Sequence, residues 1–246
     1  MAKEILRPQR IQKPGKFCPG CGHGIISRVL LEVLEEKGLS NNSIIAVGVG
    51  CSCNLRVLDG DLLQCSHGRA GATARAMKYC LPETFVMTYQ GDGDGYVIGI
   101  EHTINAAYQK ANILQIVVNN SNFGMTGGQM AWTTLPGQVT TTSPKGRSLE
   151  GPGPIHVPEM IASTLEPAFV ARAAVHTPAE IRNFKKYLTE AVEAQMNNEG
   201  YCLIEVCSPC PTNWGMSTEA SIKNVEDNVL KYYKLGVIKP RAGKEE

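Results

Sequence analysis

The clearest indication of the fold is the stretch Phe85-Val86-Met87-Thr88-Tyr89-Gln90-Gly91-Asp92-Gly93-Asp94-Gly95. An apolar run ends at its first glycine, and apolar residues three or four positions apart then continue to residue 108. A second apolar run, 113–118, ends at Asn119 and Asn120. Strand, loop, helix and strand in this order form a crossover unit of a parallel sheet. We therefore expect an α/β fold with a mostly parallel sheet flanked by helices.

Both strands of such a unit end on the same edge of the sheet, so Asp92 and Asn120 should lie at neighbouring strand tips. A charged and a neutral oxygen suit Mg²⁺ with a phosphate in its shell, and the flanking glycines allow close approach of the backbone. The interval of 28 residues between Asp92 and Asn120 resembles the thiamine-diphosphate motif. The alternative is a plain Gly/Asp turn. An EF-hand loop fits poorly, because Val97 and Thr103 would occupy its sixth and twelfth positions, and no GxGxxG fingerprint opens the helix.

The composition indicates one large domain with a full core, since the chain has 246 residues of which 43% are hydrophobic. We expect a single domain over 1–246, with a basic arm at 1–16 and a C-terminal helix and tail at 217–246. A net charge of +1 does not favour nucleic acid or a membrane surface as a partner. The start Met-Ala-Lys-Glu carries no apolar signal segment and indicates the cytoplasm.

Nine cysteines are many for a reducing compartment, where clustered thiols more often indicate metal or redox chemistry than disulfides. Cys18 and Cys21 flank a Pro-Gly turn, whereas Cys51 and Cys210 follow apolar runs that should end near Asp92. Four thiolates suit either tetrahedral zinc or a 4Fe-4S cluster. Our preferred set is Cys18, Cys21, Cys51 and Cys210, with Cys53 and Cys207 as alternatives. A thioredoxin-type pair at 18–21 is less suitable, because a Pro-rich arm precedes it.

Two further segments are candidates for binding. The segment 65–71 opens a helix of small residues, which permits phosphate to approach the backbone N–H groups. Its His67 and Arg69 are candidates for a diphosphate or an acidic substrate, although a lone histidine is more often an ordinary core residue. After Asn120, a stretch to about Pro158 lacks periodicity and far exceeds the usual loop limit of about 12–15 residues. We expect it to face a partner or the active site.

As a set, these motifs resemble the β subunit of the 2-oxoacid:ferredoxin oxidoreductases, over about Cys18–Thr218. They are CPGCG at 18–22, GVGCS at 48–52, HGRA at 67–70, GDGDG at 91–95, NNSNFGMTGGQ at 119–129 and SPCPTNW at 208–214. The resemblance implies a thiamine-diphosphate-binding fold with Mg²⁺ and a 4Fe-4S cluster. The implied reaction is CoA-dependent oxidative decarboxylation of a 2-oxoacid to an acyl-CoA, with reduction of ferredoxin.

The resemblance also implies roles for residues. Asp92, Asn120 and the backbone carbonyl of Asn122 would bind Mg²⁺, and the four preferred cysteines would hold the cluster. The residues expected around the cofactor are Cys51, Ser52, His67, Gly91, Gly93, Asp94, Gly124, Met125 and Thr126. No glutamate stands in a motif for the carboxylate that activates the aminopyrimidine. The resemblance implies that another subunit supplies it.

The implied partners are an α subunit, small γ and δ subunits of which one is ferredoxin-like, and ferredoxin itself, in a cytoplasmic hetero-oligomer of anaerobic metabolism. For the substrate we favour a branched-chain acid such as 2-oxoisovalerate, then 2-oxoglutarate, then pyruvate. Cys53-Asn54 departs from the expected pattern after GVGCS and leaves the substrate open. Arg56, Arg69 and Arg147 are candidates for a second carboxylate. Two rival functions each explain one half of the motifs: a non-oxidative thiamine decarboxylase, and an electron-relay or structural iron–sulfur or zinc subunit.

Overall fold

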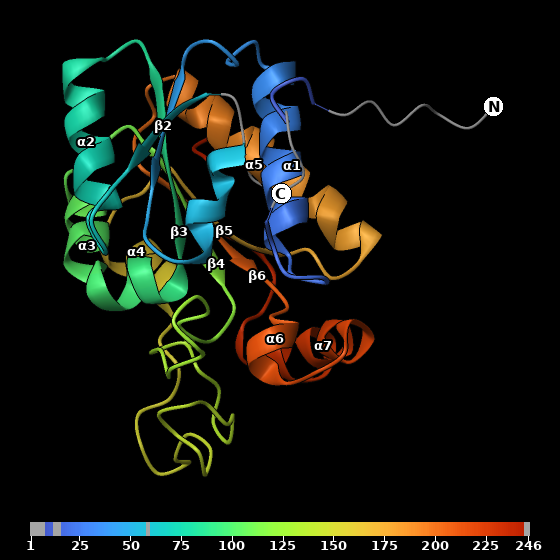
Figure 1. Ribbon diagram of the computed structural model, residues 1–246. Helices are drawn as coiled ribbons and strands as arrows, with labels where there is room; N and C mark the ends of the chain where they lie inside the picture. Colours follow the sequence, from blue (N-terminus) through green and yellow to red (C-terminus); the bar gives the residue numbers. More distant parts are fainter. Residues whose placement is uncertain (1–7, 12–15, 58–59, 244–246) are drawn as a thin grey trace.

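The computed structural model describes residues 8–11, 16–57 and 60–243. Most of the arm expected at 1–16, namely 1–7 and 12–15, lies outside the described residues. The described strands form one sheet in the order β2-β1-β3-β4-β6-β5-β7, as Figure 1 shows in part. Their bounds are β1 (Ser43–Val47), β2 (Asp61–Gln64), β3 (Phe85–Gly91), β4 (Leu114–Asn119), β5 (Phe169–Ala174), β6 (Cys202–Cys207) and β7 (Gly236–Lys239). The first six run parallel, and β7 pairs antiparallel with β5.

Helices cover both faces of the sheet, which explains why the strands read as continuous apolar runs. The helices α1 and α5 pack on one face, and α2, α3 and α4 pack on the other (Figure 1). The helices are α1 (His23–Glu36), α2 (Ala70–Cys80), α3 (Ile100–Tyr108), α4 (Val157–Thr164), α5 (Pro178–Met196), α6 (Pro211–Trp214), α7 (Thr218–Asn224) and α8 (Leu230–Tyr232). This arrangement confirms the predicted fold class.

The register of the strands brings their carboxyl ends to one edge. Gly91 at the end of β3 pairs with Val118 of β4, and Asn119 pairs with Cys207 of β6. Tyr89 pairs with Val47, the last residue of β1. The loops that follow β1, β3, β4 and β6 therefore start side by side, as the sequence predicted for Asp92 and Asn120.

Several local elements differ from the expectation. The helical pattern after Gly95 begins with a π-helical turn (Gly93–Ile98), and a 3₁₀ helix (Cys51–Val57) and β2 follow β1. The C-terminal helix expected at 217–234 divides into α7, a π-helical turn (Val225–Val229) and α8. The segment expected as a tail contains β7, a short edge strand with half-buried residues. In the described part of the chain, no helix is both long and apolar enough to cross a membrane.

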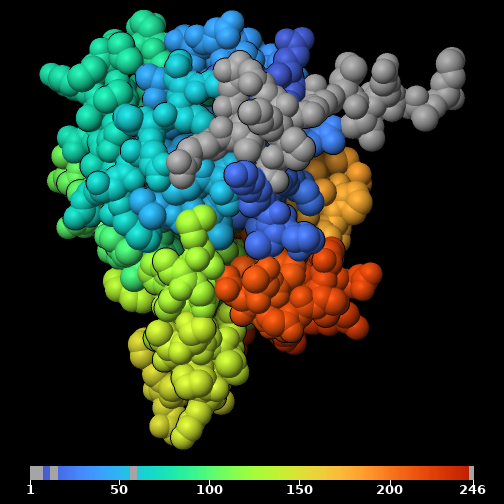
Figure 2. Space-filling model, viewed as in Figure 1, coloured from blue at the N-terminus to red at the C-terminus, as the bar shows by residue number. Residues whose placement is uncertain are grey.

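The long aperiodic segment between β4 and α4 forms a lobe that projects from the body of the molecule (Figures 1 and 2). Arg147 holds this lobe together, because its guanidinium group donates hydrogen bonds to four backbone carbonyls. The acceptors are Trp132 (2.9 Å), Thr134, Pro152 (2.7 Å) and Gly153 (2.8 Å). Within the described residues, Arg147 is therefore a structural residue of the lobe, which disfavours it as the partner of a substrate carboxylate.

Candidate functional site

A pocket opens at the carboxyl edge of the sheet, between the loops that follow β1, β2, β3 and β4. The expected residues that line it are Cys51, His67, Gly91, Asp92, Gly93, Asp94, Asn120, Asn122, Gly124, Met125 and Thr126. Val49, Gly50, His23 and Phe123 complete the lining. Ser52 is not among these residues, because its buried hydroxyl donates a hydrogen bond to the Gly48 carbonyl (3.0 Å).

Three oxygen-bearing groups converge in this pocket. One of the two terminal atoms of the Asn120 side-chain amide, which can be either its nitrogen or its oxygen, lies 3.1 Å from Asp92 Oδ1 and 2.7 Å from the carbonyl oxygen of Asn122. With nitrogen at that position, the amide donates a hydrogen bond to each oxygen. Rotated by 180°, it adds a third oxygen to the group, which is the donor set that Mg²⁺ prefers. All three residues are buried.

The electrostatics of Asp92 also fit a cation. Burial raises its pKa from an ordinary 3.8 to about 7, although hydrogen bonds from the Thr133 hydroxyl and the Gly93 amide act in the opposite direction. A cation beside the carboxylate would favour its charged form. The Thr133 hydroxyl binds Asp92 Oδ2 and leaves Oδ1 to face Asn120. Two neighbouring side-chain oxygens, Asn122 Oδ1 and Ser121 Oγ, are buried without a hydrogen-bond partner among the described residues.

Asp94, the second aspartate of the GDGDG motif, organises the loops around the pocket. Its Oδ1 accepts hydrogen bonds from the backbone amides of Gly68 (2.9 Å) and Val49 (3.2 Å) and lies against His67 Nδ1. Its Oδ2 accepts from Gln90 Nε2 (2.6 Å). One buried carboxylate therefore ties together the loops after β1, β2 and β3, and it orients the His67 ring toward the pocket that both residues line.

Glycines at two positions are required by close packing. A Cβ atom on Gly48 would overlap the Asp94 carboxylate, and one on Gly93 would overlap the Phe123 ring. At Gly50, where φ is +120°, and at Gly91, an added Cβ would meet no atom within 4 Å. These two glycines leave open space beside the backbone of the pocket. The oxygen set and this open backbone fit a cation with a diphosphate ligand.

The four preferred cysteines gather beside the same pocket. The pKa of Cys21 is raised to about 12, mainly by burial and to a smaller extent by the nearby Cys210, Cys51 and Cys18, against a hydrogen bond from the His23 backbone. Burial likewise raises the pKa of Cys51 to about 11, with additional effects from Cys210 and Cys18. Cys51 lines the same pocket as Asp92, Asn120 and Asn122, so this cysteine lies next to the oxygen set.

The two alternative cysteines lie elsewhere. Cys53 Sγ donates to the Gly48 carbonyl (3.3 Å) and accepts from Gln64 Nε2 (3.0 Å). Cys207 is fully buried in a cluster with Ala174 and Val225. Among the described residues, no group of three or more His, Cys, Asp or Glu side chains could hold a metal ion. The ligand roles of the cysteines thus stay predictions.

The turn α6, which carries the SPCPTNW motif, connects the cysteines to the oxygen set. Asn213 Nδ2 donates to the Gly124 carbonyl (2.7 Å) and lies 3.5 Å from Cys210 Sγ. Trp214 Nε1 donates to the Asn120 carbonyl (3.1 Å). The sequence motif alone did not predict these roles of Asn213 and Trp214.

Two other residues of the site were missed, for different reasons. His23 follows the CPGCG motif directly; it is fully buried, stacks on Phe17 and shares a hydrogen bond with the Tyr89 hydroxyl (2.8 Å). Its position in that motif was an available signal. Thr133 lies in the aperiodic lobe, where nothing in the sequence distinguishes it.

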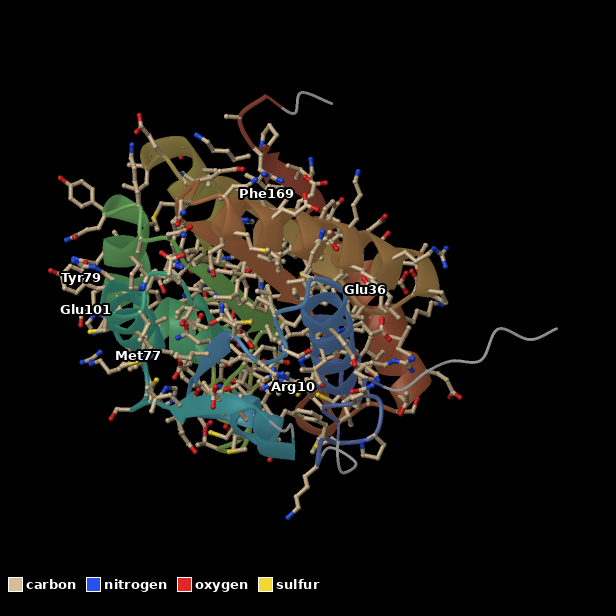
Figure 3. The ribbon with its side chains drawn as sticks, turned by 90° about the horizontal axis from the view of Figure 1, so that it is seen from above. Arg10, Glu36, Met77, Tyr79, Glu101 and Phe169 are labelled. Carbon is tan, nitrogen blue, oxygen red and sulfur yellow. The ribbon has the colours of Figure 1, made fainter. Side chains whose placement is uncertain are left out.

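The arginines proposed for a second carboxylate receive no support from the described residues. Arg69 pairs with Glu101 at 3.5 Å, and both side chains are largely exposed. Glu101 lies at the outer rim of the molecule, near Tyr79 (Figure 3). The side chain of Arg56 lies outside the described residues.

Comparisons with known proteins agree with this geometry. The sequence profile described as "Thiamine pyrophosphate enzyme, C-terminal TPP binding domain" matches residues 45–206. Ketoisovalerate oxidoreductase subunit VorA of Methanothermobacter thermautotrophicus is 35% identical over 94% of this chain and 49% of that protein. 2-Oxoglutarate synthase subunit KorB of Archaeoglobus fulgidus is 32% identical over 92% of this chain and 80% of that protein.

A solved structure is similar as well. It is the 2-oxoglutarate:ferredoxin oxidoreductase from Magnetococcus marinus with 2-oxoglutarate, coenzyme A and succinyl-CoA bound, with a TM-score of 0.73 and 28% identity. The match covers 86% of this chain and 70% of that one. The chain spans about half the length of the VorA relatives it matches. These findings confirm the resemblance: the chain belongs to the thiamine pyrophosphate enzymes and, within them, to the β subunits of the 2-oxoacid:ferredoxin oxidoreductases.

Proposed function

We propose that this chain is the thiamine-diphosphate-binding subunit of a 2-oxoacid:ferredoxin oxidoreductase. The reaction is the CoA-dependent oxidative decarboxylation of a 2-oxoacid to an acyl-CoA and CO₂, with electrons passed to ferredoxin. One observation carries the proposal. The cation-type oxygen set lies in a pocket that Cys51 also lines, and Cys18, Cys51 and Cys210 lie close enough to Cys21 to affect its pKa.

Each part of the pocket has a role in this proposal. Asp92, Asn120 and the Asn122 carbonyl hold Mg²⁺ on the diphosphate of the cofactor. His67, Gly91, Gly93, Asp94, Gly124, Met125 and Thr126 surround the diphosphate and thiazolium end. When bound, the cofactor supplies the electron sink for decarboxylation, while the protein supplies orientation and electrostatics.

Cys18, Cys21, Cys51 and Cys210 hold a 4Fe-4S cluster in this proposal. Each thiolate of such a cluster binds a different iron, so the four sulfurs need not meet at one atom, whereas tetrahedral zinc requires them to do so. A cluster beside the cofactor gives the electrons of the reaction an acceptor. Zinc has no redox chemistry and would accept none.

The partners follow from the same proposal. An α subunit supplies the activating carboxylate, small γ and δ subunits carry further electron transfer, and ferredoxin is the acceptor in the cytoplasm. Ketoisovalerate and 2-oxoglutarate enzymes both occur among the named relatives. We keep 2-oxoisovalerate as the favoured substrate, 2-oxoglutarate as the next and pyruvate as the third.

The test is an assay of the anaerobically purified native complex. Each candidate 2-oxoacid is supplied with CoA, and the reduction of a viologen dye is followed. We expect CoA-dependent reduction with a clear preference for one acid. If no acid supports reduction although about four irons per chain and thiamine diphosphate are present, an electron-relay or structural role replaces the proposal. CO₂ release without dye reduction would indicate a non-oxidative decarboxylase.

A further inference from the structure

Ser121 lies between two of the proposed magnesium ligands and has an unusual backbone. Its φ of 59° is in the left-handed region, which residues other than glycine rarely adopt. Such a conformation costs free energy and persists only where the surroundings hold it in place. At this position it turns the chain so that the Asn120 amide and the Asn122 carbonyl face each other at 2.7 Å.

Three side chains hold the backbone of the fully buried Ser121. The Ser121 amide donates to Asn119 Oδ1 (3.1 Å). The Ser121 carbonyl accepts from the Thr134 hydroxyl (2.7 Å) and from Gln138 Nε2 (3.3 Å). Asn119 is the last residue of β4, so it connects the strained residue to the rigid sheet.

Asn119 is itself fixed by a buried ion cluster. Its Nδ2 donates to Glu205 Oε1 (3.0 Å), and Glu205 Oε2 accepts from Arg172 Nε. Arg172 and Glu205 are paired neighbours on β5 and β6, and both are fully buried. Arg172 also binds Glu159 (2.7 Å) and lies 5.2 Å from the centre of the Tyr233 ring. We call Arg172, Glu205, Glu159 and Tyr233 the Arg172 cluster.

The Arg172 cluster reaches the other half of the oxygen set as well. The Tyr233 hydroxyl donates to the Thr133 carbonyl (3.0 Å), and the Thr133 hydroxyl donates to Asp92 Oδ2. Asp92 on one side and the 120–122 loop on the other are therefore anchored to one cluster, of which Arg172 and Glu205 are fully buried. The supporting residues themselves lie outside the pocket, since Asn119, Glu205 and Tyr233 are absent from its described lining.

We propose that Asn119 and Glu205 are positioning residues for the cation: they hold Ser121 in its left-handed conformation and thereby aim Asn120 and Asn122 at one point. The inference rests on the proposed function, because it assumes a cation at Asp92, Asn120 and Asn122. Outer partners of metal ligands typically change metal affinity by about 10–100-fold when they are removed.

The test measures metal binding directly rather than turnover. The full chain with thiamine diphosphate is titrated with Mn²⁺, and free Mn²⁺ is followed by electron paramagnetic resonance. Asn119→Ala is expected to weaken binding at least about tenfold. The matched control is Asn112→Ala, two residues before the start of β4, where the side chain donates to the Gln195 carbonyl (2.9 Å) and to Asn198 Oδ1 (2.7 Å). This control should bind Mn²⁺ as the wild type does.

A rescue separates positioning from general damage to the fold. Glycine adopts the left-handed conformation without steric cost. Asn119→Ala combined with Ser121→Gly should therefore recover most of the lost affinity. In addition, the Glu205→Gln variant keeps an oxygen that can accept from Asn119. This variant should therefore bind Mn²⁺ more tightly than the Glu205→Ala variant.

The outcomes distinguish this inference from the proposed function. If wild-type protein with thiamine diphosphate binds no Mn²⁺, the proposed cation site fails and the inference fails with it. If the wild type binds Mn²⁺ and Asn119→Ala binds equally well, only the inference is overturned. A double variant no better than Asn119→Ala, or equal affinities of the two Glu205 variants, would also overturn it.

Discussion

Replacement of Arg172 by methionine is expected to destabilise the protein severely. The guanidinium group is fully buried, and although burial alone would lower its pKa, the carboxylates of Glu205 and Glu159 raise it above its ordinary value. Methionine preserves most of the side-chain volume but removes the charge. Glu205, whose side chain is also fully buried, would then retain Asn119 as its one side-chain hydrogen-bond donor among the described residues.

The magnitude follows from how the partners are buried. Breaking a buried ion pair from one side costs about 3–5 kcal/mol, because it leaves an uncompensated charge in the interior. Glu159 is 43% exposed in its side chain and can be solvated, so the cost arises mainly from Glu205. For a chain of this size, that loss corresponds to a decrease in Tm of roughly 6–20 °C.

The assay is denaturant unfolding of the full chain, followed by circular dichroism, with two comparison variants. Arg172→Met combined with Glu205→Gln removes both charges and should recover much of the lost free energy of unfolding. The surface control is Lys185→Ala, which breaks contacts to Glu36 (2.7 Å) and Glu32 (3.5 Å) and should cost less than about 1 kcal/mol. Glu36 is the last residue of α1 and lies beside α5 (Figure 3).

Two results would show that the buried ion pair is not the source of the stability. One is an Arg172→Met variant as stable as the Lys185→Ala control. The other is a double variant less stable than Arg172→Met alone, because an uncompensated Glu205 would then not be the source of the loss.

Three further predictions concern the cysteines, His23 and the lobe. Cys210→Ser should lose most of the iron of the anaerobically purified protein while Cys53→Ser keeps it, as measured by iron analysis; the reverse order would contradict the ligand set. Burial lowers the pKa of His23 from 6.5 to about 4, so its imidazole is neutral in the folded protein. The unfolded chain then binds more protons between these values, and the free energy of unfolding should fall by up to about 3 kcal/mol as the pH decreases from 6.5 to 4. The His23→Gln variant should lack this part of the pH dependence of the free energy of unfolding. If the variant and the wild type show the same pH dependence, the assignment to His23 is wrong. Arg147→Met should accelerate proteolysis within 132–153, since it removes four hydrogen bonds to lobe carbonyls; cleavage at the wild-type rate would show that other contacts hold the lobe.

The sequence predicts the sheet well because both of its faces are covered. Each central strand then reads as an apolar run, and the turn residues Gly91 and Asn120 mark where two of these runs end. β7 was not predicted, since a four-residue edge strand with half-buried residues carries little apolar pattern. The π-helical turn that begins at Gly93 was not predicted either, because the spacing of apolar residues does not distinguish a π turn from an α turn.

The residues lining the pocket were largely predictable, whereas their supports were not. The Asp94 carboxylate accepts hydrogen bonds from the Val49 backbone amide and from the Gln90 side chain. No local pattern in the sequence predicts donors that lie so far apart along the chain. The sequence does contain an indication of the Arg172 cluster. One arginine and one glutamate interrupt two otherwise apolar strands, and buried opposite charges are expected to pair.

We propose that the binding of thiamine diphosphate depends on a cation held by Asp92. The most direct measurement is the binding of thiamine diphosphate to the full chain, by isothermal titration calorimetry, with and without Mg²⁺. We predict Mg²⁺-dependent binding that is abolished by EDTA and by Asp92→Ala, and unaffected by Asp227→Ala, which removes an exposed carboxylate. Equal binding by wild-type protein and Asp92→Ala, or binding unchanged by EDTA, would show that Asp92 holds no cation needed for the cofactor.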